Sequence, residues 1–410
     1  MAQQLLTDSR ITNESLMILK NNLVFSRMAN KEYSKTFGVD GAKQGDTLNI
    51  RKPARYIGRT GQALQLEDQT ETSVPLQLSN WEGCDLQFSS KDYKLSMDMF
   101  ARRVLDPAIA TVAQKIDRNG LLLAKNSVAN SVGTPGTPTN AILTYLKAGS
   151  NMDYEGCPKD NNRHLVLDTI AQATIVDALK GLFQEADEIG KQYTSGNMGK
   201  AAGFEWSMDQ NIITHTVGTL GGTPTMSLTA NQSGSSITTT GWTASVTNLL
   251  LPGDIFTIAG VYQVNPQNRQ STGQLRQFIV QSPVNSDGSG NATINILPAI
   301  VGPVSATIPG QYQNVSALPA ASAGITMSGT TGLNTVCNLA YHRDAFTLGC
   351  ADLPIPGGVE AANRVGDDES GLSILMVKAY DINMSRSITR LDVLYGWAAI
   401  YQELACQIRG

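Results

Sequence analysis

The absence of lysine from residues 201–340 is the feature that most limits how this chain can fold. The first 200 residues carry 23 basic and 22 acidic side chains, whereas residues 201–340 carry two basic and four acidic ones. This stretch is rich in Thr, Ser, Gly, Asn and Val, and short alternating runs at 227–229, 254–258 and 277–280 are separated by Pro-Gly, Asp-Gly and Ser-Gly pairs. We therefore predict an all-β unit inserted into a more highly charged body.

Two helical patterns precede this unit. Residues 11–30 have the spacing of an amphipathic arm helix, and residues 95–125 form a longer helical pattern. Pro107 should kink or divide the second helix, because proline lacks the backbone N–H that a helix interior needs. The apolar positions of the first helix include Leu16, Leu19 and Leu23. We predict that these three leucines contact another subunit.

A long hairpin is predicted between the two helices. Residues 46–56 and 74–89 both alternate, and Gly58 and Gly61 mark a polar tip between them. Because an isolated hairpin is only marginally stable in water, a long one should lie against something else. The basic side chains of this hairpin are Arg51, Lys52, Arg55 and Arg59. They form either a solvated surface or a salt-bridging contact with another subunit, and the sequence leaves both interpretations open.

Strand and helix signals continue on both sides of the inserted unit. Residues 164–167 have the character of a short buried strand, 169–184 of a helix and 203–216 of an extended segment. After the inserted unit, similar signals lie at 324–350, 370–383 and 387–403. A chain of 410 residues should form two or three packed units. The mixture of signals predicts an α+β body that is interrupted by a β-domain.

Charge and cysteine content exclude several classes of protein. The formal net charge of −4 gives no global electrostatic reason to hold nucleic acid tightly. The five cysteines include no C-x-x-C pair, which indicates reduced thiols instead of a disulfide framework or a zinc site. The sequence shows neither an apolar run approaching the ~18 residues of a membrane span nor a secretory signal. We therefore expect a protein that is made and folded in a cytoplasm, without a membrane partner.

No constellation of residues predicts catalysis. The histidines are His164, His215 and His342, and none stands in the H-E-x-x-H spacing that binds zinc, so we interpret each as structural. The glycine-containing run 196–200 lacks the Ser or Thr that follows the lysine of a phosphate-binding loop. Because nucleophile, base and orienting group do not occur together, we predict a protein that is not an enzyme and has no cofactor or metal.

Two polar runs have a weak likeness to cation sites. Residues 367–369 could offer carboxylate oxygens to a divalent ion, and residues 285–291 faintly resemble a calcium loop without its final bidentate glutamate. We interpret both as solvated turns. What remains is a chain with a long arm, a long hairpin and a stiff helix, which cannot all bury themselves within one subunit. This is the pattern expected of a shell-forming protein.

Several short runs, in order along nearly the whole chain, share their character with one known family. Gly203–Trp206 is an aromatic-acidic run just before the inserted unit, and residues 252–261 form a Gly-Asp turn followed by a strand. Further runs lie at 45–53, 84–88, 97–125, 311–315, 342–346 and 390–400. Together they resemble the coat proteins of the P22-like tailed bacteriophages, which have the HK97 fold.

The resemblance implies an HK97-like capsid fold of the α+β class with an inserted all-β barrel. The implied parts are an N-terminal arm (1–45), an E-loop (46–90), a spine helix and P-domain (91–154), an A-domain in two parts (155–221 and 321–383), an insertion barrel (222–320) and a C-terminal P-domain strand (384–410). The implied function is that of a major capsid protein, which forms hexamers and pentamers of an icosahedral shell around double-stranded DNA.

The same resemblance implies partners and a place. A scaffolding protein would guide a precursor shell, which expands when DNA is packaged, and the further implied partners are a portal protein, weakly and non-specifically bound DNA and a possible decoration protein. The protein would assemble in the cytoplasm of a bacterial host and reside in the virion. Two alternatives stay open: an encapsulin-like cargo compartment of the same fold, and a carbohydrate-binding protein that presents Trp242 and Tyr262 to sugars.

Overall fold

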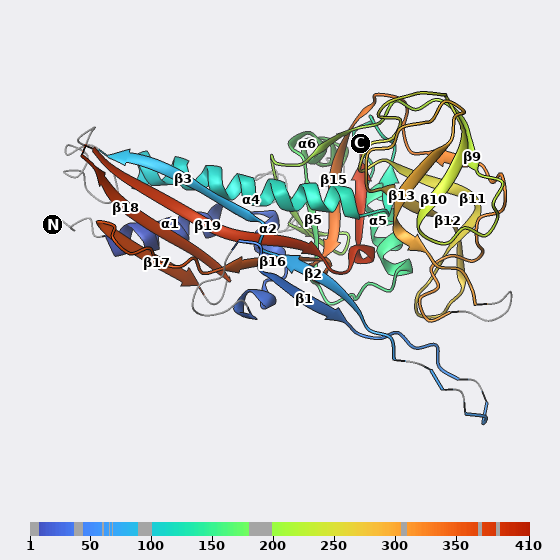
Figure 1. The fold of residues 1–410 in the computed structure, drawn as a ribbon, viewed down its shortest axis with the longest axis horizontal. Helices are drawn as coiled ribbons and strands as arrows, with labels where there is room; N and C mark the ends of the chain where they lie inside the picture. Colours follow the sequence, from blue (N-terminus) through green and yellow to red (C-terminus); the bar gives the residue numbers. More distant parts are fainter. Residues whose placement is uncertain are drawn as a thin grey trace. The chain divides into compact units, whose positions relative to one another are not determined.

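The computed structural model describes most of the chain and divides it into two units. The described residues are 8–36, 44–59, 61–64, 66–67, 69–88, 101–179, 199–304, 310–367, 371–382 and 386–410. The first unit comprises Met1–Arg51, Ser73–Leu121 and Phe346–Ile400. The second comprises Lys52–Thr72, Leu122–Ala345 and Tyr401–Gly410. Each combines helices with β-sheet, in agreement with the predicted α+β class (Figure 1).

A five-stranded antiparallel sheet forms the framework of the first unit. Its strands are β3 (Asn80–Phe88), β16 (Phe346–Ala351), β17 (Ala361–Asp367), β18 (Leu372–Asp381) and β19 (Arg386–Ala399). The central strand β19 is long enough to pair with β18 along its first part and with β16 along its last part. It also pairs with β3 from Ser387 to Tyr395.

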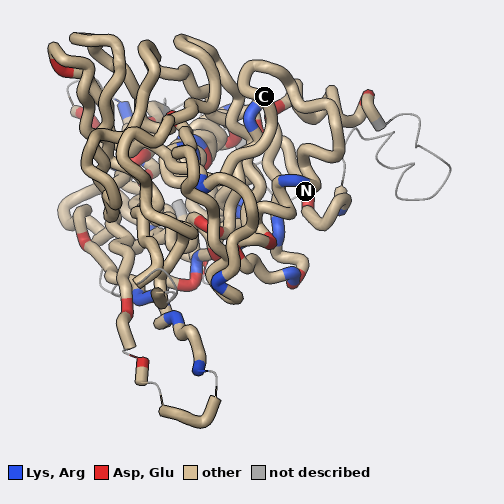
Figure 2. The backbone as a smooth tube through the Cα atoms, turned by 90° about the vertical axis from the view of Figure 1, so that its right-hand side faces the viewer, with Lys and Arg blue, Asp and Glu red and all other residues tan. Residues whose placement is uncertain are grey.

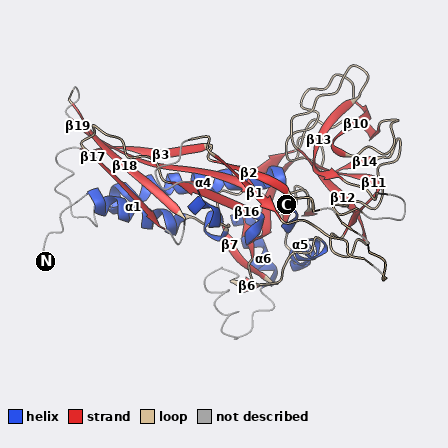
Figure 3. Ribbon diagram, turned by 60° about the horizontal axis from the view of Figure 1, so that its bottom comes forward, coloured by secondary structure: helices blue, strands red, loops and turns tan. Residues whose placement is uncertain are grey.

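Helices pack their apolar stripes onto this sheet (Figure 3). They are α1 (Asp8–Asn22), the short α2 (Phe25–Met28) and α4 (Asp106–Ser127), whose last turns count with the second unit. Leu19 of α1, Ile116 of α4 and Met376 of β18 are fully buried in one common core. Pro107 is the second residue of α4, which begins directly after a π-helical turn at Ala101–Leu105. Helical backbone continues without a break from Ala101 to Ser127, so the proline does not divide the helix, and the alternative of a kink stays a prediction.

The predicted hairpin is shorter than expected. It consists of β1 (Thr47–Lys52) and β2 (Thr72–Gln77). The alternating run 74–89 is not one strand, because the backbone N–H of buried Leu78 bonds to Asp46 and the chain then turns into β3, which pairs with β19. Gly396 of β19 permits this crossing, since a side chain there would collide with the backbone oxygen of Gln77. The residues between the two strands, 53–71, are called the tongue loop below.

A seven-stranded mixed sheet forms the body of the second unit. Its strands are β4 (Ser131–Gly133), β5 (Arg163–Leu167), β6 (Lys200–Ala201), β7 (Phe204–Met208), β8 (Thr214–Thr216), β15 (Asn334–His342) and β20 (Ala405–Arg409). Helices α5 (Ile142–Tyr154) and α6 (Thr169–Leu179) share a core with it. The strand at 164–167 and the helix that begins at Thr169 are confirmed. The sequence analysis did not predict α5 or β20.

The predicted all-β unit is present and closes into a barrel. Its strands are β9 (Gly222–Met226), β10 (Gly234–Trp242), β11 (Ile255–Val264), β12 (Ser271–Val280), β13 (Ala292–Ile300) and β14 (Ile325–Met327). In the sheet order β14-β11-β12-β13-β10-β9 the two edge strands meet, because Thr225 bridges to Gly324 and the N–H of Met226 bonds to the oxygen of Ala323 at 2.8 Å. The run 227–229 follows β9 and is not a strand. The barrel encloses its own apolar core, which includes Phe256 and Phe278.

Candidate functional site

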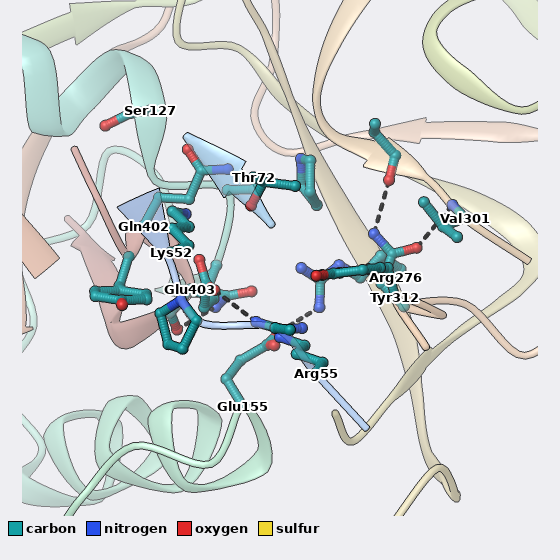
Figure 4. A pocket seen from close by; sticks show the side chains of 18 residues that line it. Lys52, Arg55, Thr72, Ser127, Glu155, Arg276, Val301, Tyr312, Gln402 and Glu403 are labelled. Carbon is teal, nitrogen blue, oxygen red and sulfur yellow. Dashed lines mark hydrogen bonds and ion pairs between the residues drawn. The ribbon is translucent and has the colours of Figure 1, made fainter. Parts of the chain in front are cut away.

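The candidate site is a pocket of about 330 Å³ in the second unit, where the tongue loop begins and ends. We call it the root pocket. Five segments line it: the chain at both ends of the tongue loop, the chain around the end of α4, Glu155 at the end of α5, the barrel and the turn before β20 (Figure 4). Its charged and aromatic lining residues are Lys52, Arg55, Glu155, Arg276, Tyr312, Tyr401 and Glu403.

Two of the predicted contact residues have partners in their own chain at this pocket. Arg55 places Nη2 2.8 Å from Oε1 of Glu403, and its guanidinium lies over the ring of Tyr312, 6.0 Å from the ring centre. The ammonium of Lys52 lies over Tyr401, 5.0 Å from its ring centre. Burial lowers the pKa of Lys52, an effect that the Glu403 carboxylate opposes. The structure thus shows a third possibility for Lys52 and Arg55, which is contact with residues of their own chain.

A buried ion pair forms part of the lining of the root pocket. Arg276 of β12 contacts Glu155 through Nη1, and the two side chains are only 4% and 6% exposed. The same oxygen of Glu155 accepts a hydrogen bond from Nε2 of Gln263 at 2.6 Å. Within the described residues, Nε of Arg276 has no hydrogen-bond partner. Sequence reasoning did not find this pair, because its members lie 121 positions apart and only the fold brings them together.

Hydrogen bonds shape the tongue loop beyond its root. Glu67 accepts the backbone N–H groups of Ile57 and Gly58, each at 2.8 Å, and the Ile57 bond is the main reason why the pKa of Glu67 is lowered. The hydroxyl of Tyr312 donates to the backbone oxygen of Thr70, and Nη1 of Arg59 donates to the oxygen of Gly61. Basic residues occupy one limb of the loop and acidic residues the other (Figure 2).

The tongue loop exposes apolar side chains. Leu64 and Leu66 are 78% and 88% exposed. Tyr56 and Ile57 are exposed as well. Large apolar side chains that gather on one loop and stay in water are typical of an interaction surface. Contacts of Arg51, Lys52, Arg55 and Arg59 with another subunit remain predictions, and the exposed leucines are the residues that our sequence analysis of this loop missed.

The three leucines of the arm helix have a different environment. Leu16, Leu19 and Leu23 are buried in the core of the first unit, together with residues of α4, β18 and β19. They stabilise the fold of their own chain in this structure. A contact with a neighbouring copy through these side chains would require α1 to leave that core.

The histidines and cysteines are structural in their surroundings. All three histidines are buried, and burial lowers the pKa of His215 although its Nε2 lies 2.8 Å from Asp254. All five cysteines are free thiols. Within the ranges that the structure describes, no cluster of three or more His, Cys, Asp or Glu residues is placed to hold a metal ion. None of the described helices has both the length and the hydropathy that a bilayer crossing requires.

The remaining candidates for binding are turns or core residues. Asp287 folds the run 285–291 back on itself, because its carboxylate accepts the N–H groups of Ser289 and Asn291, each at 2.8 Å, and these bonds lower its pKa. Asp367 pairs with Lys20 at 2.6 Å, and its neighbours 368 and 369 lie outside the described residues, as does most of the run 196–200. The sugar-binding alternative loses one of its two aromatic residues, since Trp242 is buried in the barrel core and donates to Thr239, whereas Tyr262 is exposed.

Comparison with known proteins identifies the family. A family model described as P22 coat protein, gene protein 5, matches residues 8–410. The chain belongs to the P22 coat protein family. It is a major capsid protein of a tailed bacteriophage, as the resemblance of its sequence implied.

Solved structures with a similar arrangement also come from phages. A chain from Mycobacterium phage Che8 is 10% identical with a TM-score of 0.43, and the match covers 94% of this chain and 90% of that one. The capsid of cyanophage P-SCSP1u is 10% identical with a TM-score of 0.42, covering 94% and 87%. The I-domain of the CUS-3 coat protein is 30% identical with a TM-score of 0.17, covering 27% of this coat protein and 94% of that domain. No curated protein matches the chain.

Proposed function

We propose that this coat protein forms hexamers and pentamers, which close into an icosahedral shell around double-stranded DNA. The observation that carries the proposal is the tongue loop, whose exposed leucines stand on a root that the same chain braces with ion pairs. A loop that is held by an ion pair at its root and exposes apolar side chains is suited to lie on a neighbouring copy. Contacts of this obligate class bury more than about 2,000 Å².

The partners of assembly belong to the same proposal. A scaffolding protein guides a precursor shell in the cytoplasm of the bacterial host, a portal protein occupies one vertex, and the shell expands on packaging. A decoration protein is a possible further partner. The net charge of −4 supports weak, salt-sensitive contacts with DNA, because a container must confine DNA without holding it. We propose no catalytic activity, in keeping with a family of structural proteins.

Assembly of the purified chain tests the proposal. We expect megadalton species by native mass spectrometry and closed shells by negative-stain microscopy when the chain is combined with its scaffolding protein. Deletion of residues 57–63 should leave a soluble monomer that forms no shells, because it removes the turn that Glu67 organises. Normal particles from the deletion variant would exclude the tongue loop from the mechanism. Shells that enclose a protein cargo instead of DNA would favour the encapsulin-like alternative.

A further inference from the structure

The root pocket has more positive than negative charge. Its lining contains three cationic side chains, Lys52, Arg55 and Arg276, and two carboxylates, Glu155 and Glu403. Each carboxylate is already paired with an arginine, Glu403 with Arg55 and Glu155 with Arg276 (Figure 4). Three positive charges less two negative charges leave one positive charge without a counter-charge in the lining. The ammonium of Lys52, which lies over an aromatic ring, carries this excess.

One buried hydrogen-bond donor of the pocket lining has no acceptor within the described residues. Arg276 lines the pocket, and its side chain is only 4% exposed. Its Nε has no hydrogen-bond partner within the described residues. A buried donor without an acceptor destabilises a fold, and it recovers that loss when a ligand supplies an oxygen.

These observations define the ligand by its chemistry. We propose that the root pocket binds one carboxylate group, and that in the assembled shell this group belongs to an Asp or Glu side chain of a second copy of the chain. A single negative charge neutralises the lining, whereas a dianion such as phosphate would reverse its sign next to two fixed carboxylates. Arginine N–H groups match the geometry of a carboxylate, which accepts two parallel hydrogen bonds.

The choice of a second copy rests on the proposed function. The pocket lies at the root of the loop that we propose to lie against a neighbour, so side chains of that neighbour reach it at high local concentration. The chain has 35 acidic residues and a net negative charge, so each copy presents many carboxylates to the next. A free carboxylic acid would occupy the same pocket, but only by competing with that side chain.

Binding to the unassembled chain is the first test. The chain is labelled with ¹⁵N-arginine, and the Nε–H signals are followed as sodium acetate replaces sodium chloride at constant ionic strength. We expect a subset of the arginine signals to move with acetate. Lys52→Gln should weaken the acetate affinity about five-fold, since it removes the excess charge from a partly screened site. Lys147→Gln is the matched control, because it removes the charge of an exposed lysine on α5 of the same unit that does not line the pocket, and we expect less than a two-fold effect.

Assembly in the same two salts is the second test. With scaffolding protein, acetate should slow shell formation by the wild-type chain several-fold relative to chloride, as measured by light scattering. Lys52→Gln should assemble slowly in both salts, and Lys147→Gln should behave as the wild type.

The outcomes test separately whether the pocket binds a carboxylate and whether a second copy of the chain supplies it. Arginine signals that ignore acetate would refute a carboxylate site. Signals that move while assembly is equally fast in both salts would show a site for free acids alone and would refute the second copy as occupant. Failure of the wild-type chain to assemble in chloride would refute the proposed function, and the second-copy occupant with it, while the titration would still decide the pocket.

Discussion

At the scale of single residues, a buried aspartate has the most demanding position. Asp117 of α4 is 1% exposed and accepts the backbone N–H groups of Val24 and Ser26, each at 2.8 Å, and the hydroxyl of Ser26. It thereby caps the short helix α2, which has no capping side chain of its own. Asp117 and its partner Ser26 lie 91 positions apart in the sequence, so no local sequence pattern predicts this contact.

Replacement of this carboxylate should destabilise the first unit. Asp117→Ala leaves two buried backbone donors without an acceptor, and we expect a loss of about 2–4 kcal/mol in the free energy of unfolding. Asp117→Asn retains one acceptor oxygen and should lose less. Asp85→Ala is the control, because Asp85 is largely exposed and its removal should change stability by less than about 0.5 kcal/mol. Urea unfolding of the unassembled chain measures all three, and equal stability of the alanine variants would contradict the capping role.

The cysteines predict how the protein responds to alkylation. Burial raises the pKa of both Cys350 and Cys406 to about 12, and it also raises the pKa of the half-buried Cys84. Because the thiolate is the nucleophile, Cys350 and Cys406 should not react with iodoacetamide at pH 8 until the chain unfolds. Cys84 should react first, and Cys84→Ser should remove the fastest step. Mass spectrometry of the modified sites would disprove this order if Cys350 or Cys406 reacted in the native chain.

The same shifts give stability a dependence on alkaline pH. An unfolded cysteine loses its proton near pH 8.5, whereas Cys350 and Cys406 in the folded chain hold theirs to about pH 12. The unfolded state therefore binds fewer protons between these values, and stability should fall as the pH rises through that range. Cys350→Ala and Cys406→Ala should each make unfolding less sensitive to pH between 9 and 11, as measured by thermal unfolding. An unchanged pH dependence would contradict this assignment.

At the scale of elements, the sequence predicted what local patterns determine. The central part of the lysine-free stretch, from β9 to β14, forms a barrel because its β-branched and alternating residues fill one enclosed core. The failures have a common cause. Residues 74–89 alternate throughout, but only β3 pairs with β19. The break at Leu78 depends on the bond of its backbone N–H to Asp46, which lies far from it in the sequence.

The candidate site was predictable only in part. The basic residues at the start of the tongue loop stood out by composition, and the structure places Lys52 and Arg55 in the root pocket. Their acidic partner Glu403 and the pair of Arg276 with Glu155 could not be predicted, because tertiary pairing over more than a hundred positions leaves no periodic signal in one sequence. The arm leucines show the converse, since helical spacing identifies an apolar face but does not say what covers it.

One side chain fastens the barrel to the body of the second unit. Gln277 of β12 accepts the backbone N–H of Ser131 at 2.6 Å and donates to the backbone oxygen of the same residue at 3.0 Å. Gln277→Ala should lower the free energy of unfolding by about 1–2 kcal/mol, because it leaves the backbone N–H and oxygen of Ser131 in the short strand β4 without this partner. Gln274→Ala, on the exposed part of the same strand, should have no measurable effect. Hydrogen exchange at Ser131 should quicken in the first variant only, and equal exchange in both would refute the clamp.

At the scale of the whole molecule, the chain exposes apolar surface that its own fold does not use. Leu66 of the tongue loop is 88% exposed and Leu228 of the barrel is 85% exposed, so the two leucines contribute equally little to the stability of a single chain. They differ in position, because Leu66 stands on the loop that is braced at its root and Leu228 follows β9. If copies of the chain contact one another through the tongue loop, assembly should depend on Leu66 and not on Leu228.

Substitution of these matched leucines separates folding from assembly. Leu66→Ser and Leu228→Ser should each change the free energy of unfolding by less than about 0.5 kcal/mol. Burial of a leucine at a contact contributes about 1.5–3 kcal/mol, which is roughly ten-fold to a hundred-fold in association at each copy of the contact. Because one shell repeats this contact many times, Leu66→Ser should raise the concentration needed for assembly far above that of the wild type. Leu228→Ser should assemble as the wild type does. Light scattering and negative-stain microscopy measure the difference, and shells from Leu66→Ser at the wild-type concentration would show that the tongue loop does not bind its neighbour through this side chain.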